Sequence, residues 1–246
     1  MTGGPLQATL ESARQGSVRA LARLMGRAEN HGITEADLGA PGSAREGCPV
    51  IGLTGPPGVG KSTFVSCLVA EYRRRGKRVA VLCFDPSSPV TGGALLGDRI
   101  RMQEHSDDPG VFIRSVSSRG HLGGLSATAR PMISVLSAVG FDVILIETVG
   151  AGQSEVEIAS VADRTVVVLA PGAGDGIQLA KAGVLEVADL YVVNKADQDG
   201  VHGMVRELRA MVALGTVDIP VVTTTASRGE GAAEVIAALG TDGERD

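Results

Sequence analysis

The residues with the clearest chemical pattern form a glycine-rich run near position 60. The run matches the phosphate-binding pattern G-x-x-x-x-G-K-[ST] and consists of Gly55, Pro56, Pro57, Gly58, Val59, Gly60, Lys61, Ser62 and Thr63. Glycines let such a loop turn tightly, so that backbone N–H groups and a helix N-terminus point at phosphate oxygens. Lys61 is expected to reach the β- and γ-phosphates, and the Ser62 hydroxyl to bind Mg²⁺. The run predicts a nucleotide-binding site.

A second motif indicates which base the nucleotide carries. Asn194, Lys195 and Asp197 have the form N-K-x-D and follow an apolar stretch at 188–193. A carboxylate at Asp197 can accept hydrogen bonds from N1–H and the 2-amino group of guanine, whereas adenine would leave that carboxylate unpaired. Asn194 can bond the loop or purine N7, the Lys195 stem can lie along the base, and a backbone N–H at Thr225 or Ala226 can meet guanine O6. The motif favours GTP and GDP over ATP.

Acidic residues at the ends of two apolar stretches predict a magnesium site. Asp85 ends the stretch 78–84 and Glu147 ends the stretch 142–147, so both should emerge at the sheet edge that carries the phosphate loop. There a carboxylate can hold Mg²⁺ directly or through water, although either acid could instead cap a helix or turn. Asp98 can reach the metal, position water or be a plain surface acid, and the Gly150 N–H can contact the γ-phosphate.

Other polar residues have two readings. The segments 91–102, 119–124 and 171–176 are rich in glycine, which is costly to order, and this suits loops that order around a nucleotide. Within them, Arg119 and His121 either contact a substrate phosphate or a partner, or are solvated loop residues. Arg73, Arg74 and Arg75 end a helical pattern, and we expect them to complement its dipole and stay solvated.

The elements that must position these residues alternate along the chain. Apolar, β-type stretches lie at 50–54, 78–84, 111–116, 142–147, 164–170, 188–193 and 219–224, and helical patterns lie at 61–75, 154–161, 201–213 and 231–239. Stretches that are apolar throughout suit strands buried on both faces of a parallel sheet. The pattern predicts an α/β fold with a doubly wound, mostly parallel sheet of about seven strands and ligands at the strands' carboxyl ends.

Composition excludes several classes of protein. The net charge of −5 argues against a dedicated nucleic-acid binder, and 2% aromatic residues without tryptophan argue against base-stacking platforms. An apolar content of 43% over 246 residues supports a sizeable core rather than disorder. Three separated cysteines give no disulfide framework, and neither a secretory leader nor a membrane-spanning stretch is apparent. We therefore expect a soluble, cytoplasmic protein.

The chain is expected to have three parts. Residues 1–45 form a helical extension and linker, 46–240 form the nucleotide-binding domain, and 241–246 form a polar tail. Within the extension, residues 6–29 read as one amphipathic helix that packs on the main domain rather than on a partner.

Several less common sequence motifs make the chain resemble the MeaB/ArgK family of P-loop GTPases. This family belongs to the SIMIBI class, and its members are chaperones of methylmalonyl-CoA mutase. The motifs are Asp85-Pro-Ser-Ser-Pro, Leu96-Gly-Asp-Arg-Ile-Arg-Met, Ser118-Arg-Gly-His-Leu-Gly-Gly and Glu147-Thr-Val-Gly-Ala-Gly-Gln-Ser-Glu, together with the phosphate loop and Val193-Asn-Lys-Ala-Asp. The resemblance covers about residues 15 to 239.

The resemblance implies Mg²⁺-dependent GTP hydrolysis and an adenosylcobalamin-dependent acyl-CoA mutase as partner, whose cofactor loading and protection the GTPase gates. Hydrolysis is expected to be slow until the mutase accelerates it. Ser62, Asp85, Asp98 and Glu147 would hold the metal, and Lys61, Asp98 and Glu147 would be catalytic, with no side chain assigned as general base. Switch I would lie around Asp98, switch II at Glu147–Glu155 and switch III at Gly174–Val184.

The sequence departs from the family pattern at three places. The family usually continues into a helical arm that forms a homodimer, whereas this chain ends at Asp246, so dimerisation by that route is in doubt. Gly176 replaces an acidic residue of switch III, and Pro131 is expected to mark a first helical turn or a kink. Two other functions stay open: an ATP-dependent small-molecule kinase of the amino-acid transport type, and a nickel metallochaperone GTPase. The absence of a His/Cys cluster speaks against the second.

Overall fold

The computed structural model describes residues 4–30, 32–38, 47–85, 103–105, 107–117, 124–148, 157–172 and 187–241. Its strands are β1 (Val50–Thr54), β2 (Val79–Asp85), β3 (Val111–Ser117), β4 (Val143–Thr148), β5 (Arg164–Leu169), β6 (Leu190–Val193) and β7 (Val221–Thr223). Its α-helices are α1 (Pro5–Arg14), α2 (Val18–Glu29), α3 (Lys61–Arg74), α5 (Gly124–Val139), α7 (Val201–Val212) and α8 (Ala232–Leu239). Short 3₁₀ helices are η1 (Glu35–Leu38), η3 (Gln103–His105), η4 (Ile158–Ser160) and η7 (Ala226–Arg228).

The seven strands form one sheet in the order β3-β2-β4-β1-β5-β6-β7. Every pairing between them is parallel, which confirms the predicted α/β fold. Because the strands are parallel, all their carboxyl ends lie at one edge of the sheet. Glu147 on β4 pairs in register with Leu53 on β1 and Cys83 on β2, and Val193 on β6 pairs with Leu169 on β5. The ends of β1, β2, β4 and β6 therefore bring the phosphate loop, Asp85, Glu147 and the N-K-x-D segment to the same edge.

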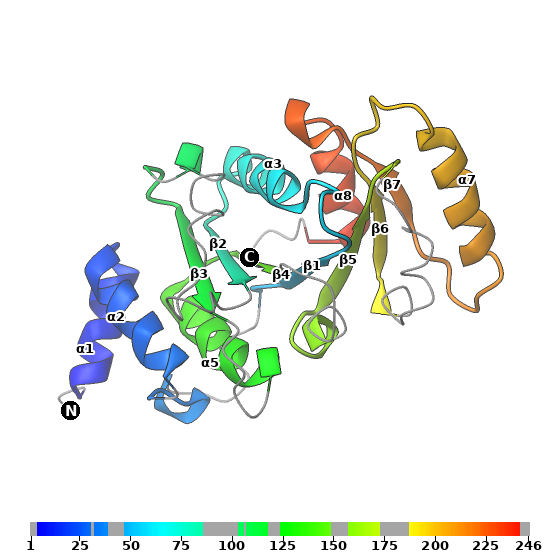
Figure 1. The fold of residues 1–246 in the computed structure, drawn as a ribbon. Coiled ribbons are helices and arrows are strands. Elements are labelled where there is room, and N and C mark those ends of the chain that lie inside the picture. Colours follow the sequence, from blue (N-terminus) through cyan, green and yellow to red (C-terminus); the bar gives the residue numbers. More distant parts are fainter. Residues whose placement is uncertain are drawn as a thin grey trace, which may run out of the picture.

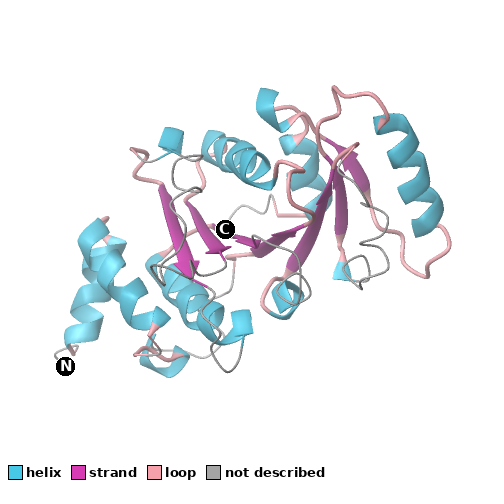
Figure 2. Ribbon diagram, in the orientation of Figure 1, coloured by secondary structure: helices cyan, strands magenta, loops and turns pink. Residues whose placement is uncertain are grey.

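Helices cover both faces of the sheet, so the strands form the central layer (Figure 2). Alternate residues of β4 show why the strands are apolar throughout. Ile144 and Ile146 belong to the buried cluster under α5, whereas Val143 and Leu145 belong to the cluster under α3 and α8 (Figure 1). A third cluster, with Val201 and Leu208 of α7, packs against β5 and β6. Burial on both faces stabilises each aliphatic side chain by about 2 kcal/mol.

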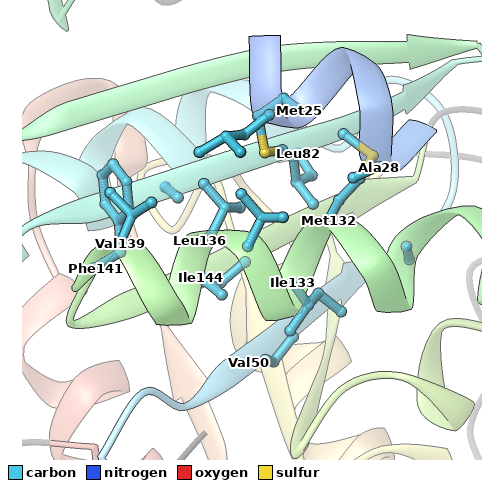
Figure 3. Close-up of a cluster of buried hydrophobic side chains, with 14 of the residues drawn as sticks. Met25, Ala28, Val50, Leu82, Met132, Ile133, Leu136, Val139, Phe141 and Ile144 are labelled. Atoms are coloured by element: carbon cyan, nitrogen blue, oxygen red, sulfur yellow. The ribbon is translucent and has the colours of Figure 1, made fainter. Parts of the chain in front are cut away.

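The N-terminal helical segment differs from the prediction of a single helix over 6–29. It is two helices, because Gly16 adopts a left-handed φ of +93° and the Ser17 side chain caps α2 by accepting a hydrogen bond from Ala20 N at 3.3 Å. Both helices pack on the main domain, as expected: Met25 and Ala28 of α2 lie beside Met132 and the rest of the α5 cluster (Figure 3). The extension therefore shares a core with the sheet.

Two smaller expectations are met in part. Of the helix predicted at 154–161, the described part (157–161) contains the helical residue Glu157 followed by the 3₁₀ helix η4. Of the two roles predicted for Pro131, a place in the first turn is wrong, since it lies inside α5. The three cysteines are buried, and none of them forms a disulfide bond. None of the helices in the described ranges combines the length and the apolar character needed to span a lipid bilayer.

Candidate nucleotide-binding site

The phosphate loop connects β1 to α3. At two positions its backbone conformation and its close neighbours require glycine. Gly55 has φ +141°, and a Cβ atom there would lie 2.1 Å from the carbonyl oxygen of Val168 on β5. Gly60 has φ +90°, and its Cβ would lie 2.8 Å from Asn194 Nδ2. A side chain at either position would collide with its neighbour. The loop thus wraps closely around the ends of β5 and β6 before α3 begins at Lys61.

The Lys61 side chain folds back onto the phosphate loop and bonds its backbone. Its side-chain ammonium donates to the carbonyl oxygens of Gly55 at 2.7 Å and Pro56 at 3.0 Å, and the residue is 7% exposed. A buried ammonium needs such acceptors to offset its desolvation. The positive charge is therefore fixed at the loop, next to the N-terminus of α3, where the helix dipole also attracts anions.

Ser62 and Glu147, both predicted to bind Mg²⁺, lie in direct contact. The Ser62 hydroxyl donates to Glu147 Oε1 at 2.8 Å, and the two residues are 6% and 1% exposed. A hydroxyl and a carboxylate oxygen in contact are hard oxygen donors of the kind that Mg²⁺ prefers, so the residues present fit this ion. Asp85 ends β2, beyond the register pair Phe84–Thr148, which puts its backbone at the same edge. Asp98 and Gly150 lie outside the described residues.

Asn194 joins the phosphate loop to the segment after β7. Its Nδ2 donates to the carbonyl oxygen of Val59 at 2.9 Å, while Oδ1 accepts from Thr224 Oγ1 and from Ala226 N, both at 3.1 Å. The residue is 2% exposed. Of the two roles predicted for Asn194, the structure shows the bond to the loop. The Ala226 N–H, which we predicted could meet guanine O6, here donates to Asn194, and the Thr225 N–H donates to Glu230 O at 3.1 Å.

Lys195 bonds the phosphate loop one peptide earlier than Asn194, at Gly58. Its Nζ donates to the carbonyl oxygen of Gly58 at 2.8 Å. In a planar trans peptide, C=O and N–H point in opposite directions. Because the carbonyls of Gly58 and Val59 face Lys195 and Asn194, the N–H groups of Val59 and Gly60 face the other way, into the loop. The N-K-x-D segment thereby orients two of the donors expected to bind phosphate.

The side chain of Asp197, the residue predicted to read the base, is 36% exposed. Its Oδ2 is 3.6 Å from Arg228 NH2, at the end of η7. Sequence reasoning missed Thr224, immediately before the predicted pair Thr225 and Ala226, and Arg228, two residues after it. The signal for Thr224 was present, since a hydroxyl at the end of a strand beside an N-K-x-D segment can bond the asparagine.

The remaining candidates fall into two groups. Pro57 and Gly58 are exposed at the tip of the loop, Val59 is buried beneath it, and Thr63 is exposed on α3. Arg119, His121 and Gly176 lie outside the described residues. Within the ranges that the structure describes, no group of three or more His, Cys, Asp or Glu side chains is placed to hold a metal ion.

Comparisons with known proteins agree with this geometry. Residues 41–242 match the model of a family described as "Methylmalonyl Co-A mutase-associated GTPase MeaB". A protein of Pyrococcus horikoshii named as a GTPase is 50% identical over 201 residues, which are 80% of this chain and 62% of that protein. The methylmalonic aciduria type A homolog of Mus musculus, named as mitochondrial, is 47% identical over 61% of this chain and 36% of its own length.

A solved structure extends the likeness to the fold. The structure of a protein named "LAO/AO transport system kinase" superposes with a TM-score of 0.72 at 27% identity, covering 98% of this chain and 76% of that one. This chain thus spans only about a third to two thirds of the length of the two relatives above.

Proposed function

Because the chain belongs to the MeaB family of methylmalonyl-CoA mutase-associated GTPases, we propose that it hydrolyses GTP to GDP and phosphate and acts as a chaperone. Its client would be an adenosylcobalamin-dependent acyl-CoA mutase, whose cofactor loading and protection the nucleotide cycle gates. The observation that best supports the proposal is the joining of a phosphate loop and an N-K-x-D segment by direct hydrogen bonds at one sheet edge.

Hydrolysis would proceed by positioning and charge stabilisation. When bound, Mg²⁺ neutralises charge on the β- and γ-phosphates, and Ser62 and Glu147 would hold it together with Asp85 and Asp98. Lys61 exchanges its bonds to Gly55 and Pro56 for phosphate oxygens, which are stronger acceptors than carbonyls. The Val59 and Gly60 N–H groups bind the same phosphates. Lys61→Ala should nearly abolish turnover in a phosphate-release assay, and wild-type turnover in that variant would contradict the site assignment.

The same geometry supports guanine as the base. Asp197 stands at the end of the loop that begins at Asn194, with its carboxylate partly exposed to a ligand. Asp197→Asn should lose its preference for GTP and gain binding of xanthosine triphosphate, because the amide can donate to the 2-keto group of xanthine. Competition profiles that match the wild-type protein would contradict this assignment.

A kinase is the second candidate, because a structurally similar protein is named as a transport system kinase. A kinase that uses ATP has no use for a guanine-reading carboxylate. The two functions separate in one assay: purified protein with Mg²⁺ and either GTP or ATP, with and without free amino acids as acceptors. A GTPase releases phosphate from GTP without an acceptor, whereas a kinase transfers phosphate from ATP to the acceptor.

The partnership with a mutase is tested by the same turnover assay with the mutase added. We expect slow hydrolysis of GTP alone and acceleration of several-fold with an adenosylcobalamin-dependent acyl-CoA mutase from the same source. Lys61→Ala serves as the control, since it keeps the surface but should show no acceleration. If the mutase leaves wild-type hydrolysis unchanged, the proposed partner is wrong, and Gly176 in the predicted switch III is the first position to examine.

A further inference from the structure

One face of α3 carries three polar residues at helical spacing. Ser62, Ser66 and Arg73 are four and seven residues apart, so they lie in a row along the helix. Ser62 contacts Glu147 in the nucleotide site. Ser66 and Arg73 contact the chain between Glu104 and Asp108, just before β3. Helix α3, which begins at the phosphate loop, therefore makes two further side-chain contacts, one with η3 and one with the turn after it.

The first contact is a hydrogen-bond cluster of Ser66, Glu104 and His105, in which Ser66 and His105 are largely buried and the Glu104 side chain is 68% exposed. His105 Nε2 lies 2.8 Å from Ser66 Oγ and 3.2 Å from the carbonyl oxygen of Ser66, and the Ser66 hydroxyl also contacts Glu104 Oε1. A carbonyl oxygen only accepts hydrogen bonds, so Nε2 carries the proton and donates. The Ser66 hydroxyl can then donate to the Glu104 carboxylate. Ser66 is 5% exposed and the His105 side chain 12%, so water competes little for the bonds between these two residues.

The second contact lies two turns further along α3, at Arg73. Arg73 Nε donates to Asp108 Oδ2 and the Gly110 N–H donates to Asp108 Oδ1, both at 2.8 Å. The hydrogen bond from Arg73 and that from Gly110 hold the pKa of Asp108 below its usual value. Arg73 also donates to the carbonyl oxygen of Lys77 at 2.6 Å. The prediction that Arg73 stays solvated is therefore wrong, although Arg74, with a side chain 70% exposed, behaves as expected.

We propose that His105 is a positioning residue for GTP hydrolysis, which acts through Ser66 by holding η3 against the face of α3 that carries Ser62. The chain that leaves β2 at Asp85 returns to described structure at Gln103, immediately before this cluster. The cluster holds η3 against α3 four residues from Ser62, which itself contacts Glu147. This inference rests on the proposed function, because it uses the metal-binding role of Ser62.

The decisive experiment compares His105→Leu with His105→Gln. Leucine fills a similar volume but has no donor, whereas glutamine keeps an N–H donor on a side chain of similar reach. Single-turnover hydrolysis of GTP should slow about five- to ten-fold in His105→Leu, the effect of one lost hydrogen bond, and return to within about twofold of wild type in His105→Gln. The Kd for GDP, which lacks the γ-phosphate, should change less than about twofold in both variants. His202→Leu, at an exposed position of α7, is the matched control and should match wild type.

The readouts separate positioning from mere stability. A purely structural role would lower Tm and weaken GDP and GTP binding together, and that result would overturn the proposal. Unchanged hydrolysis in His105→Leu would overturn it too. If His105→Leu fails to fold, Ser66→Ala removes the hydroxyl that contacts His105, with a smaller change in volume and with the backbone carbonyl kept, and must also slow hydrolysis selectively. Failure of the proposed function is recognised separately, since the wild-type protein would then release no phosphate from GTP.

Discussion

Replacing Asn194 by alanine tests whether the phosphate loop and the base-side loops form one cooperative unit. The side chain is 2% exposed and makes three hydrogen bonds, to Val59 O at 2.9 Å and to Thr224 Oγ1 and Ala226 N at 3.1 Å. Alanine removes all three and leaves their partners buried. Thr224 is itself 1% exposed, so bulk water does not reach its hydroxyl without local rearrangement.

The size of the effect follows from these bonds. A neutral hydrogen bond contributes about 1 kcal/mol net, and a buried group left unsatisfied costs about 1–3 kcal/mol. The Thr224 hydroxyl can rotate toward another acceptor, so the penalty falls mainly on the Ala226 N–H and the Val59 carbonyl. We expect Asn194→Ala to lower the free energy of unfolding by about 3 kcal/mol, and Thr224→Val to lower it by about 1 kcal/mol.

The assay is urea unfolding of the nucleotide-free protein at pH 7, followed by circular dichroism. Thr224→Ser, which keeps the hydroxyl, is the control and should lie within about 0.5 kcal/mol of wild type. In the double variant the two losses should fall short of additivity by about 1 kcal/mol, because the Asn194–Thr224 bond can be lost only once. A loss below about 1 kcal/mol in Asn194→Ala, or strict additivity, would refute the argument.

Three further predictions address backbone strain, pH and an unsatisfied hydroxyl. Lys195 has φ +58°, which costs about 1 kcal/mol, so Lys195→Gly should be at least as stable as Lys195→Ala while both bind GDP more weakly; a less stable glycine variant in thermal melts would contradict this. The hydrogen bond from Arg74, reinforced by Arg75, lowers the pKa of Glu71 from 4.5 to about 2. Its stabilisation is therefore present above the unfolded pKa and lost as pH falls toward the folded value. As the pH falls from about 5 to about 2, the free energy of unfolding of the wild type, measured by urea titration, should decrease by on the order of 1 kcal/mol more than that of Glu71→Gln. Equal decreases would count against the ion pairs. Ser137 Oγ on α5 is buried without a hydrogen-bond partner, so Ser137→Ala should stabilise by about 1 kcal/mol, whereas Ser134→Ala, which removes a bond to Arg130 O, should not; a lower Tm for Ser137→Ala would show that the hydroxyl is used.

The parts of the fold that the sequence predicts well are those with strong local signals. All seven apolar stretches are strands, with ends shifted by two residues or fewer, because strands buried on both faces admit few polar residues. The phosphate loop and the N-K-x-D segment are recognisable since each is short and continuous. Their arrival at one edge follows from parallel strands alone. The break between α1 and α2 was missed because the apolar stripe continues across it, although Gly16 and Ser17 are a left-handed glycine and an N-cap residue.

Contacts that depend on tertiary structure were beyond the sequence. Ser66 reads as an ordinary helix residue, and His105 as one of four histidines, until the fold places them 2.8 Å apart. Arg73, Arg74 and Arg75 have the same local sequence signal, yet Arg73 pairs with Asp108 and both Arg74 and Arg75 pair with Glu71, and only the Arg74 side chain, at 70%, stays exposed. Which arginine of such a run stays solvated is decided by the face of the helix that each occupies and by what packs there.

The contacts between Asn194, Lys195 and the phosphate loop imply that base recognition and phosphate binding are coupled. These two residues leave little freedom in the peptides that follow Gly58 and Val59, since each carbonyl is held by a donor from the end of β6. A ligand that displaces the Asn194 or Lys195 side chain breaks the bond to the Val59 or Gly58 carbonyl, and the peptide plane that carries the Gly60 or Val59 N–H is then free to turn. A guanine that fits the N-K-x-D segment thus leaves the phosphate donors in place, whereas a base that displaces Lys195 disturbs them. A base that disturbs these two peptides should accordingly lower the hydrolysis rate as well as weaken nucleotide binding. The ratio of rates between GTP and another nucleotide, and not only the ratio of their Kd values, should therefore report the discrimination between bases.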